Sequence, residues 1–362
     1  MEHKKPCVLI VWKEFKPHIL MFLAQVGCAL VYFITEASFN HGMSPFLYVT
    51  YRYFVAALFM FPFAYFLERK QRPKLTFALF MEIFVLSLVG ISAPINMYFA
   101  SLQYTSPTLV ASMFNIVASL TFIIAVALRY EALDLGDAHG IGKVVGTLIS
   151  LGGVMMMTLY KGPKVKNLWG PLIHIQGRSG GSQENWLKGS VLAVTSCVSL
   201  SVWYIMQAST LKRYPAQLSL TSWMCFVGAM QSAIFTAIVE HRHPSAWLIG
   251  FNIDLWSTLY GGIVVSGLVI YVSLWCTEKK GPVFVTMTTP LCTVVVAILA
   301  YFVFGEKLYV GSIIGACFVI VGLYLLLWGK EADNQEEVDT TIITKDASTK
   351  CNVVEDPLEC RV

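Results

Sequence analysis

Two stretches of the sequence resemble each other and decide the fold. Residues 105–131 read TSPTLVASMFNIVASLTFIIAVALRYE, and residues 280–306 read KGPVFVTMTTPLCTVVVAILAYFVFGE. Aligned at an offset of 175, they place Pro107 opposite Pro282, and both end in glutamate. After a six-residue gap the alignment resumes with glycine opposite glycine: Gly146 with Gly315, and Gly153 with Gly322. This shared order of link, proline, apolar run and glycine-rich run indicates an internal duplication.

The composition is that of a membrane protein with several spans. Of the 362 residues, 56% are hydrophobic and only 13% are charged, against about 25% charged in a typical soluble domain. Apolar runs of roughly 20 residues, long enough to cross a bilayer as a helix, recur along the chain. Ten spans are expected, at about 17–38, 45–67, 77–100, 106–128, 141–160, 187–208, 217–239, 256–276, 282–304 and 309–328.

The spans fall into two groups of five. The expected organisation is a cytoplasmic N-terminus (1–16), a first five-helix repeat (17–160), a long extracytoplasmic loop (161–186), a second five-helix repeat (187–329) and a disordered acidic cytoplasmic tail (330–362). Residues 331–362 hold nine acidic residues against three basic ones, a composition that cannot bury a core.

The distribution of basic residues predicts the orientation. With the N-terminus inside, the inner segments hold 15 Lys and Arg residues and the outer segments hold 7. Cytoplasmic loops carry such an excess of Lys and Arg, so both termini are predicted to be cytoplasmic. No segment is a clear targeting signal; the plasma membrane is favoured and the vacuolar membrane remains an alternative.

The number of spans in each half determines how the halves are related. Five is an odd number, so the second half must be inverted relative to the first. Inverted repeats are a recurring plan of transporters, which place a substrate site near the middle of the membrane between the halves. The sequence therefore predicts a transporter for a small molecule that works by alternating access.

Polar residues inside the spans are candidates for the transport path, because they are costly in a membrane. Gln25 lies in the first span. In the fourth, Ser112, Asn115 and Ser119 share one helical face, and the ninth has a comparable face that contains Thr286, Thr289 and Thr293.

Two charged residues lie within the first helical hairpin. Glu36 is near the outer end of the first span, and Arg52 is about two turns into the second span from the same side. The two side chains could form a structural ion pair, since an unpaired charge in lipid is expensive. The alternative is a proton site or a site for a substrate carboxylate.

Two prolines interrupt apolar spans. Pro94 and Pro290 each remove a backbone donor and crowd the carbonyl four residues earlier, at Gly90 and Thr286 respectively. Exposed carbonyls at membrane depth are tolerated where they face protein or a wet cavity. Each proline is therefore either a packing kink or a helix break that lines the path.

The sequence contains no enzyme signature. It has no GxxxxGK phosphate-binding loop, no HExxH and no GxSxG. Neither catalytic residues, nor a metal, nor a cofactor is expected. The expected partners are a small-molecule substrate and the lipid bilayer, and no nucleic acid.

Several stretches together resemble one family. Residues 36–76, EASFNHGMSPFLYVTYRYFVAALFMFPFAYFLERKQRPKLT, are similar to the signature of the plant nodulin-21-like transporters. That group, also called UMAMIT or "walls are thin"-related, belongs to the drug/metabolite transporter superfamily and has EamA-type repeats. Further similar stretches are QYTSPTLVASMFN (103–115), LYKGP (159–163), QASTLKRYPAQLSLT (207–221), WCTEKKGPVFVTMTTPL (275–291) and FGEKLYVGSIIGACFVIVGLY (304–324).

The resemblance implies an all-α fold of ten transmembrane helices in two inverted EamA-type repeats. It also implies facilitated, often bidirectional movement of amino acids, with auxin or another small organic acid as the alternative substrate. The residues that match the family's central cavity are Asn96, Tyr98, Trp203, Gln207, Ser266 and Tyr271. The chain departs from the family pattern after Asn115, where many relatives have a proline, and at Ser273, where many have glutamine.

Overall fold

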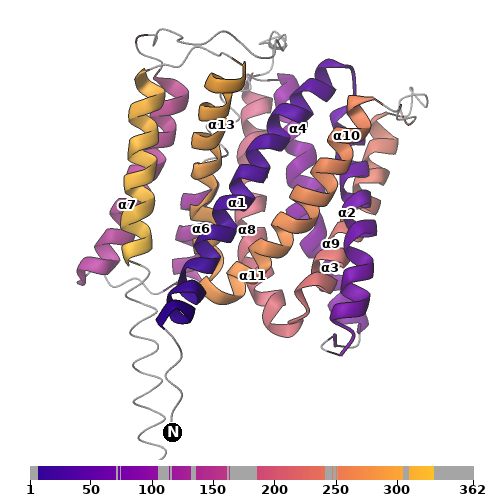
Figure 1. Ribbon diagram of the computed structural model, residues 1–362. Coiled ribbons are helices and arrows are strands. Elements are labelled where there is room, and N and C mark those ends of the chain that lie inside the picture. Colours follow the sequence, from indigo (N-terminus) through magenta and orange to yellow (C-terminus); the bar gives the residue numbers. More distant parts are fainter. Residues whose placement is uncertain are drawn as a thin grey trace, which may run out of the picture.

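The structure is a computed structural model that describes residues 7–70, 72–73, 75–104, 114, 116–131, 136–160, 163, 186–240, 247, 250, 252–304 and 310–329. In these residues the chain forms helices and no strands. The helices stand side by side in one bundle (Figure 1).

The ten predicted spans correspond to helices in the expected order. The first half contains α1 (Cys7–Asn40), α2 (Pro45–Leu67), α3 (Phe77–Ser87), η1 (Leu88–Ser92), α4 (Ala93–Tyr104), α6 (Ile116–Ala127) and α7 (Ala138–Leu159). The second half contains α8 (Trp186–Arg213), α9 (Gln217–Val239), α10 (Ile253–Tyr260), η4 (Gly261–Val269), α11 (Ile270–Lys280), α12 (Pro282–Met287), α13 (Thr289–Phe304) and a last helix, Val310–Gly329.

Nine of these helical segments are long and apolar enough to cross a membrane in the described part of the chain. Within the predicted fourth span, the structure describes a shorter apolar helix, Ile116–Ala127. The residues at the N-termini of α2 and α7 explain why these two helices begin where they do. Pro45 is at the first position of α2, where its missing N–H removes no helical bond, and the Asp137 side chain accepts a hydrogen bond from the backbone N–H of His139 at the start of α7.

The third and eighth spans are not continuous α-helices. In each, a π-helical segment, η1 or η4, lies between two α-helical parts. Glu82 of the third span and Asp254 of the eighth are equivalent residues, 172 apart, and the same offset moves residues 88–92 onto 260–264, of which 261–264 lie within η4. The two halves therefore contain a π-helical segment in equivalent spans and at equivalent positions along them.

The two halves are interleaved. α1 packs against α10, η4 and α13 of the second half, while α8 packs against η1, α4 and α6 of the first. α1 and α8 are the first spans of the two repeats, so the two-fold relation between the repeats converts one set of contacts into the other. α2 and α9, also equivalent, pack against each other extensively.

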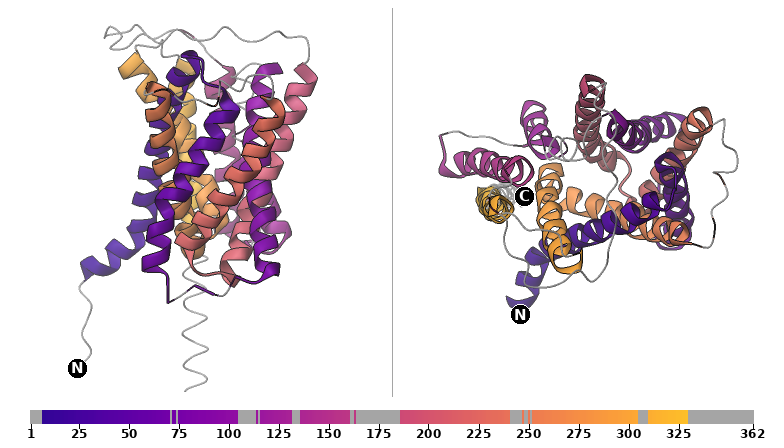
Figure 2. Two further views of the ribbon diagram at one scale, coloured as in Figure 1. Left: turned by 90° about the vertical axis from the view of Figure 1, so that its right-hand side faces the viewer. Right: turned by 90° about the horizontal axis from the view of Figure 1, so that it is seen from above.

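The contact between α7 and the last helix shows that the repeats are inverted. A Cβ atom on Gly146 would lie 2.6 Å from the carbonyl oxygen of Gly322, and one on Gly153 would lie 2.7 Å from that of Gly315. The sequence alignment pairs Gly146 with Gly315 and Gly153 with Gly322, so exchanging the halves turns one contact into the other. Only a two-fold axis between antiparallel helices does this. The predicted inverted repeat is confirmed, and the two helices stand side by side at one edge of the bundle (Figures 1 and 2).

Polar contacts between the halves repeat in the same way at both ends of the bundle. At one end, Asp254 accepts a hydrogen bond from Ser38 at 2.6 Å and contacts His41 at 3.2 Å. At the other, Glu82 accepts hydrogen bonds from Thr210 at 2.8 Å and from Arg213 at 3.3 Å. Each member of one cluster is 172 residues from its counterpart in the other (38 and 210, 41 and 213, 82 and 254).

A second pair of contacts joins the ends of α2 and α9. Glu68 follows the C-terminus of α2 and accepts hydrogen bonds from the backbone N–H groups of Leu218 and Ser219, at the start of α9. Glu240 follows the C-terminus of α9 and accepts one from Ser44, the residue that precedes α2. Glu68 and Glu240 are again 172 residues apart (68 and 240). Each helix of the pair thus ends in a carboxylate that binds the beginning of the other.

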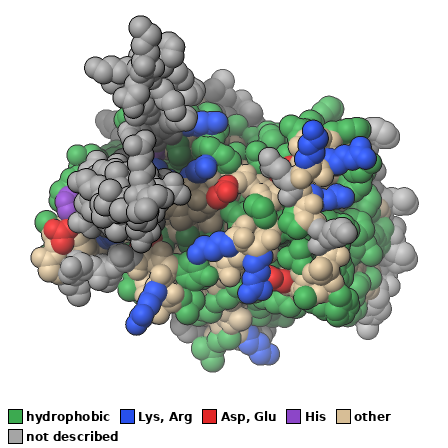
Figure 3. All heavy atoms as spheres, turned by 90° about the horizontal axis from the view of Figure 1, so that it is seen from below, with side chains coloured by type: hydrophobic (Ala, Val, Ile, Leu, Met, Phe, Trp, Pro, Cys, Tyr) green, Lys and Arg blue, Asp and Glu red, His purple; other side chains and the backbone are tan. Residues whose placement is uncertain are grey.

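Basic side chains are present at one end of the bundle (Figure 3). The beginning of α1, the α2–α3 connection, the α8–α9 connection and the α11–α12 connection lie at the same end, the lower end in Figure 1. Lys and Arg side chains are spread over this face (Figure 3). These segments are the ones that the sequence places together on the predicted cytoplasmic side.

Candidate functional site

The ninth span breaks next to Pro290. α12 ends at Met287, Thr288 forms a turn, and Pro290 is the second residue of α13. Because proline lacks an N–H group, it is tolerated in the first turn of a helix and not in its interior. At the break, the Thr288 hydroxyl donates to the carbonyl of Val285 at 2.7 Å and accepts a hydrogen bond from the Gln25 side chain at 3.2 Å. Gln25 of α1 is thereby held against the break from the opposite half.

The third span accommodates Pro94 differently. Pro94 is the second residue of α4, directly after the π-helical segment η1. Hydroxyl groups of α8 reach the backbone here: Ser199 donates to the carbonyl of Val89 at 2.7 Å, and Ser196 donates to that of Pro94 at 2.6 Å. Backbone carbonyls in the membrane interior are therefore satisfied by the other half, as is required where a spanning helix is interrupted.

α8 brings two unpartnered polar groups to one face. A Cβ atom on Gly90 of η1 would lie 1.9 Å from the Trp203 ring, so only glycine allows the indole to pack so closely. Among the described residues, neither the Trp203 indole N–H nor either amide atom of Gln207 has a hydrogen-bond partner. Gln207 is completely buried. Because residues four apart lie on one helix face, the indole and the amide are neighbours.

Arg52 is held between α2 and η4. Its Nε donates to the Ser266 hydroxyl at 2.6 Å, and its guanidinium carbon lies 5.2 Å from the centre of the Tyr53 ring and 5.9 Å from that of Tyr48. The thiol of Cys225 in α9 donates to the Ser266 carbonyl at 3.2 Å. The structure thus joins two predicted site residues, Arg52 and Ser266; the pairing of Arg52 with Glu36 stays a prediction.

The other predicted residues are distributed around these contacts. Asn96 is buried and donates to the Ser92 carbonyl at 2.7 Å and weakly to Ser232 of α9 at 3.5 Å, and its Oδ1 has no partner among the described residues. The Tyr98 ring packs edge-on against Phe114, with their centres 4.7 Å apart. Thr289 and Tyr271 are half-buried. Asn115 and Ser112 lie outside the described residues.

The structure adds Tyr204 to the candidate site. Tyr204 follows Trp203 in α8, with the centres of the two rings 4.9 Å apart, and it packs against the hydrophobic cluster that contains Tyr53 of α2. It packs with Phe284 and Val285 of α12. The sequence could have indicated Tyr204 as a site residue, because it is next to Trp203 and three residues before Gln207. This indication is weak, because aromatic residues are common in these spans.

The comparisons with known proteins agree with this architecture. The model of the EamA-like transporter family matches residues 15–159 and 187–328, one match for each half. The chain belongs to the EamA-like transporter family. A WAT1-related protein of Arabidopsis thaliana is 41% identical over 88% of this chain and 82% of its own length. Protein WALLS ARE THIN 1 of the same plant is 38% identical over 89% and 85%.

A solved crystal structure shows the same fold. It superposes with a TM-score of 0.67 and covers 86% of this chain and 98% of its own, at 16% identity. The chain is therefore a plant WAT1-like EamA transporter with two inverted five-helix repeats in a membrane. In the described residues no group of His, Cys, Asp and Glu could hold a metal ion. The residues that the two halves bring together are polar and aromatic.

Proposed function

We propose that this transporter is a bidirectional facilitator of amino acids that works by alternating access. The observation that carries the proposal is the buried amide of Gln207 beside the indole N–H of Trp203, neither of which has a hydrogen-bond partner among the residues that the structure describes. An unpaired buried polar group costs about 1–3 kcal/mol. Such a group is expected where a ligand supplies the missing hydrogen bonds.

A zwitterionic amino acid fits this pair of groups. The amide N–H of Gln207 and the indole N–H of Trp203 are donors for a substrate carboxylate, and the amide oxygen of Gln207 is an acceptor for a substrate ammonium. Neutral groups bind both ends without a fixed charge, which would be expensive at this depth. Gln25 at the break in the ninth span, and Asn96 with its unpartnered oxygen, supply further amides on other helices.

The movement that we propose is a rocking of the two halves about the α2–α9 pair. This pair is joined at both ends by the Glu68 and Glu240 contacts. The helix breaks in the third, eighth and ninth spans lie at the places where α1 and α8 cross into the other half. Alternating access in inverted-repeat transporters is largely such a rigid-body motion around a fixed site.

The main alternative is a transporter of auxin or another small organic acid, and Arg52 favours it. A guanidinium group binds a carboxylate with two parallel hydrogen bonds, and Arg52 places such a group within the spanning helix α2. The flanking rings of Tyr48 and Tyr53 could pack against an aromatic acid. A proton-coupled metabolite carrier is a further alternative, in which Glu36 would be the proton site.

Efflux from preloaded oocytes tests the proposal. We expect cells that express the chain at the surface to release radiolabelled glutamine or another neutral amino acid faster than control cells, and Gln207→Leu to abolish the difference. Labelled auxin is measured in parallel. Auxin efflux that depends on Arg52 and is unaffected by Gln207→Leu would favour the organic acid, and movement of neither substrate from cells with confirmed surface expression would refute both.

A further inference from the structure

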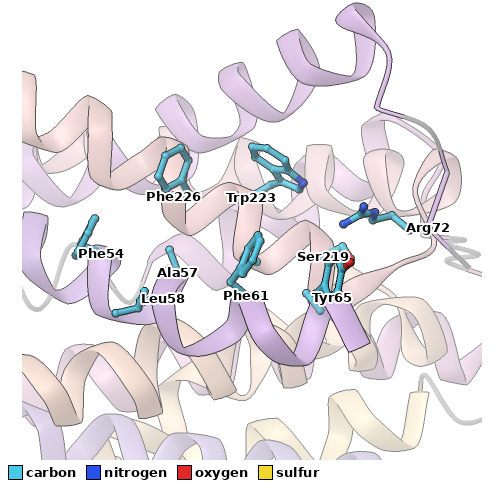
Figure 4. A pocket seen from close by; sticks show the side chains of 11 residues that line it. Phe54, Ala57, Leu58, Phe61, Tyr65, Arg72, Ser219, Trp223 and Phe226 are labelled. Carbon is cyan, nitrogen blue, oxygen red and sulfur yellow. The ribbon is translucent and has the colours of Figure 1, made fainter. Parts of the chain in front are cut away.

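A groove on the outside of the bundle has one charged end. It lies between α2 and α9 and has a volume of about 300 Å³. Its walls are mainly apolar, with Phe54, Phe61, Trp223 and Phe226 among them. The charged end of the groove is the one at which the side chains of Arg72 and Ser219 lie close together (Figure 4).

The groove faces the lipid. Both α2 and α9 are long and apolar enough to cross the membrane, and side chains at the rim of the groove are exposed on the surface of the bundle: Leu58 is 70% exposed and Phe61 is 59% exposed. The groove is separate from the unpartnered groups of Trp203 and Gln207, which are buried in the bundle. Its occupant must therefore come from the membrane.

The groove matches one leaflet in length. From Phe54 to Tyr65, α2 rises by about 16 Å at 1.5 Å per residue, and half of the hydrocarbon core of a bilayer is about 15 Å thick. Arg72 follows the end of α2 at Leu67, so it lies at the level of the lipid headgroups. A single lipid acyl chain can fill the groove while the headgroup of the same molecule reaches Arg72.

The charge of Arg72 is available to a ligand. Arg72 is exposed and forms no ion pair with any residue that the structure describes. Glu68, one turn earlier, already accepts hydrogen bonds from two backbone N–H groups of α9, at 2.8 and 2.7 Å. Arg69 and Lys70 are exposed beside it, so the surroundings of Arg72 are positively charged.

The repeat shows that the charged end is a special feature of one side. Phe54 and Phe226 are equivalent positions (54 and 226, again 172 apart), and both line the groove. The residues equivalent in sequence to Arg72 and Ser219 are Pro244 and Leu47, whose side chains carry neither a charge nor a hydroxyl. The symmetry of the fold therefore does not account for the charged end.

We propose that this groove binds an anionic phospholipid of the leaflet predicted to be cytoplasmic. One acyl chain lies between α2 and α9, and the headgroup phosphate contacts the Arg72 guanidinium. Anionic lipids give the cytoplasmic leaflet its negative surface potential, which attracts basic residues next to the membrane. Because α2 and α9 belong to different halves, the bound lipid joins the two repeats and stabilises the pair about which they are proposed to rock.

The test uses the purified full-length chain in detergent, titrated with phosphatidylserine or with phosphatidylcholine of the same acyl chains. Binding is followed by native mass spectrometry and by the shift in melting temperature. We expect phosphatidylserine to bind at least about five-fold more tightly than phosphatidylcholine, roughly one kcal/mol by the relation between affinity and free energy. Arg72→Gln should remove this preference, and Leu58→Trp, which fills the groove, should weaken both lipids.

Lys70→Gln is the matched control, because it removes the same charge from the same connection outside the groove. The proposal is overturned if Lys70→Gln reduces the preference as much as Arg72→Gln, which would indicate a general surface charge. It is also overturned if the unaltered chain shows no preference, or if Leu58→Cys forms disulfide-linked dimers across the groove in lipid, which would make a second copy the occupant.

Discussion

At the scale of single residues, a structural role and a substrate-binding role of Gln207 predict opposite effects of its substitution on the stability of the protein. The amide is completely buried and lacks partners among the described residues. Leucine has a similar volume and no polar atoms, so Gln207→Leu should leave the free energy of unfolding unchanged or raise it by about 1 kcal/mol.

The same variant should lower transport at least about ten-fold, because a site built to hydrogen-bond its substrate loses discrimination when those bonds are lost. Melting temperature in detergent and efflux per molecule at the surface are measured on one preparation of the variant. A loss of both stability and transport would instead assign the amide to the fold.

Glu68 and Glu240 occupy equivalent positions but bind different partners, so their substitution should have unequal effects. Glu68 accepts from two backbone N–H groups at the N-terminus of α9, where a negative charge interacts favourably with the helix dipole. Glu68→Gln should lower stability by about 1 kcal/mol. Glu240→Gln should change it less, because the glutamine carbonyl still accepts from the Ser44 hydroxyl. The melting temperatures of the two variants are compared. An equal or larger decrease in melting temperature for Glu240→Gln would contradict the larger stabilising effect assigned to Glu68.

At the scale of helices, the close packing of α7 against the last helix depends on glycine residues, which have no side chain. A Cβ atom on Gly146 would lie 2.6 Å from one backbone atom and 2.7 Å from another, so Gly146→Ala must push the helices apart. Overpacking of this kind typically costs about 1–3 kcal/mol. Gly152→Ala is the matched control in the same helix, because nothing lies within 4 Å of its Cβ position. Size-exclusion chromatography after heating should show an earlier loss of the folded peak for Gly146→Ala only.

The helices themselves were predictable because the membrane imposes a simple rule on sequence. A spanning helix needs about 20 apolar residues, and the predicted second span, 45–67, coincides with α2 because Pro45 and the charged residues after Leu67 mark its ends. The inverted repeat was predictable from the odd number of spans in each half. Both arguments use the pattern of the chain and need no side-chain contact.

The interruptions and the partners of the site residues were not predictable in the same way. Two prolines indicated irregular helices, but a π-helical segment also occupies residues 261–269, which contain no proline. The pairing of Arg52 with Ser266, 214 residues away, depends on how α2 and η4 are rotated about their axes. Side-chain packing sets that rotation, and a hydropathy pattern does not record it. The unpartnered state of Gln207 is likewise a property of its surroundings and not of its sequence position.

At the scale of the whole molecule, the two-fold relation controls how the halves are held together. His41 with Asp254 at one end corresponds to Arg213 with Glu82 at the other, and the Glu68 and Glu240 contacts correspond in the same way. Each of these contacts joins the first half to the second. α1 and α8 have their main neighbours in the opposite half. The bundle is therefore one cooperative unit, although its sequence is a duplication.

This interleaving predicts how the halves behave when they are separated. A first half that ends within residues 161–186 leaves α1 without α10, η4 and α13, and it exposes Gln25 and the acceptors of α8's hydroxyl groups at η1 to lipid. Buried polar groups without partners are expensive in a membrane. Each half expressed alone should therefore be degraded or aggregated, whereas the two halves expressed together from a chain cut in this loop should assemble and transport.

Fluorescent tags on each half allow the yield of folded material to be compared by size-exclusion chromatography, with the uncut chain as the reference. A first half that migrates as a stable monomer by itself would show that its five helices are a complete folding unit. In that case the contacts of α1 with the second half would only add to a structure already formed, and the two-fold contacts at the ends of α2 and α9 would have to form by docking of two finished domains.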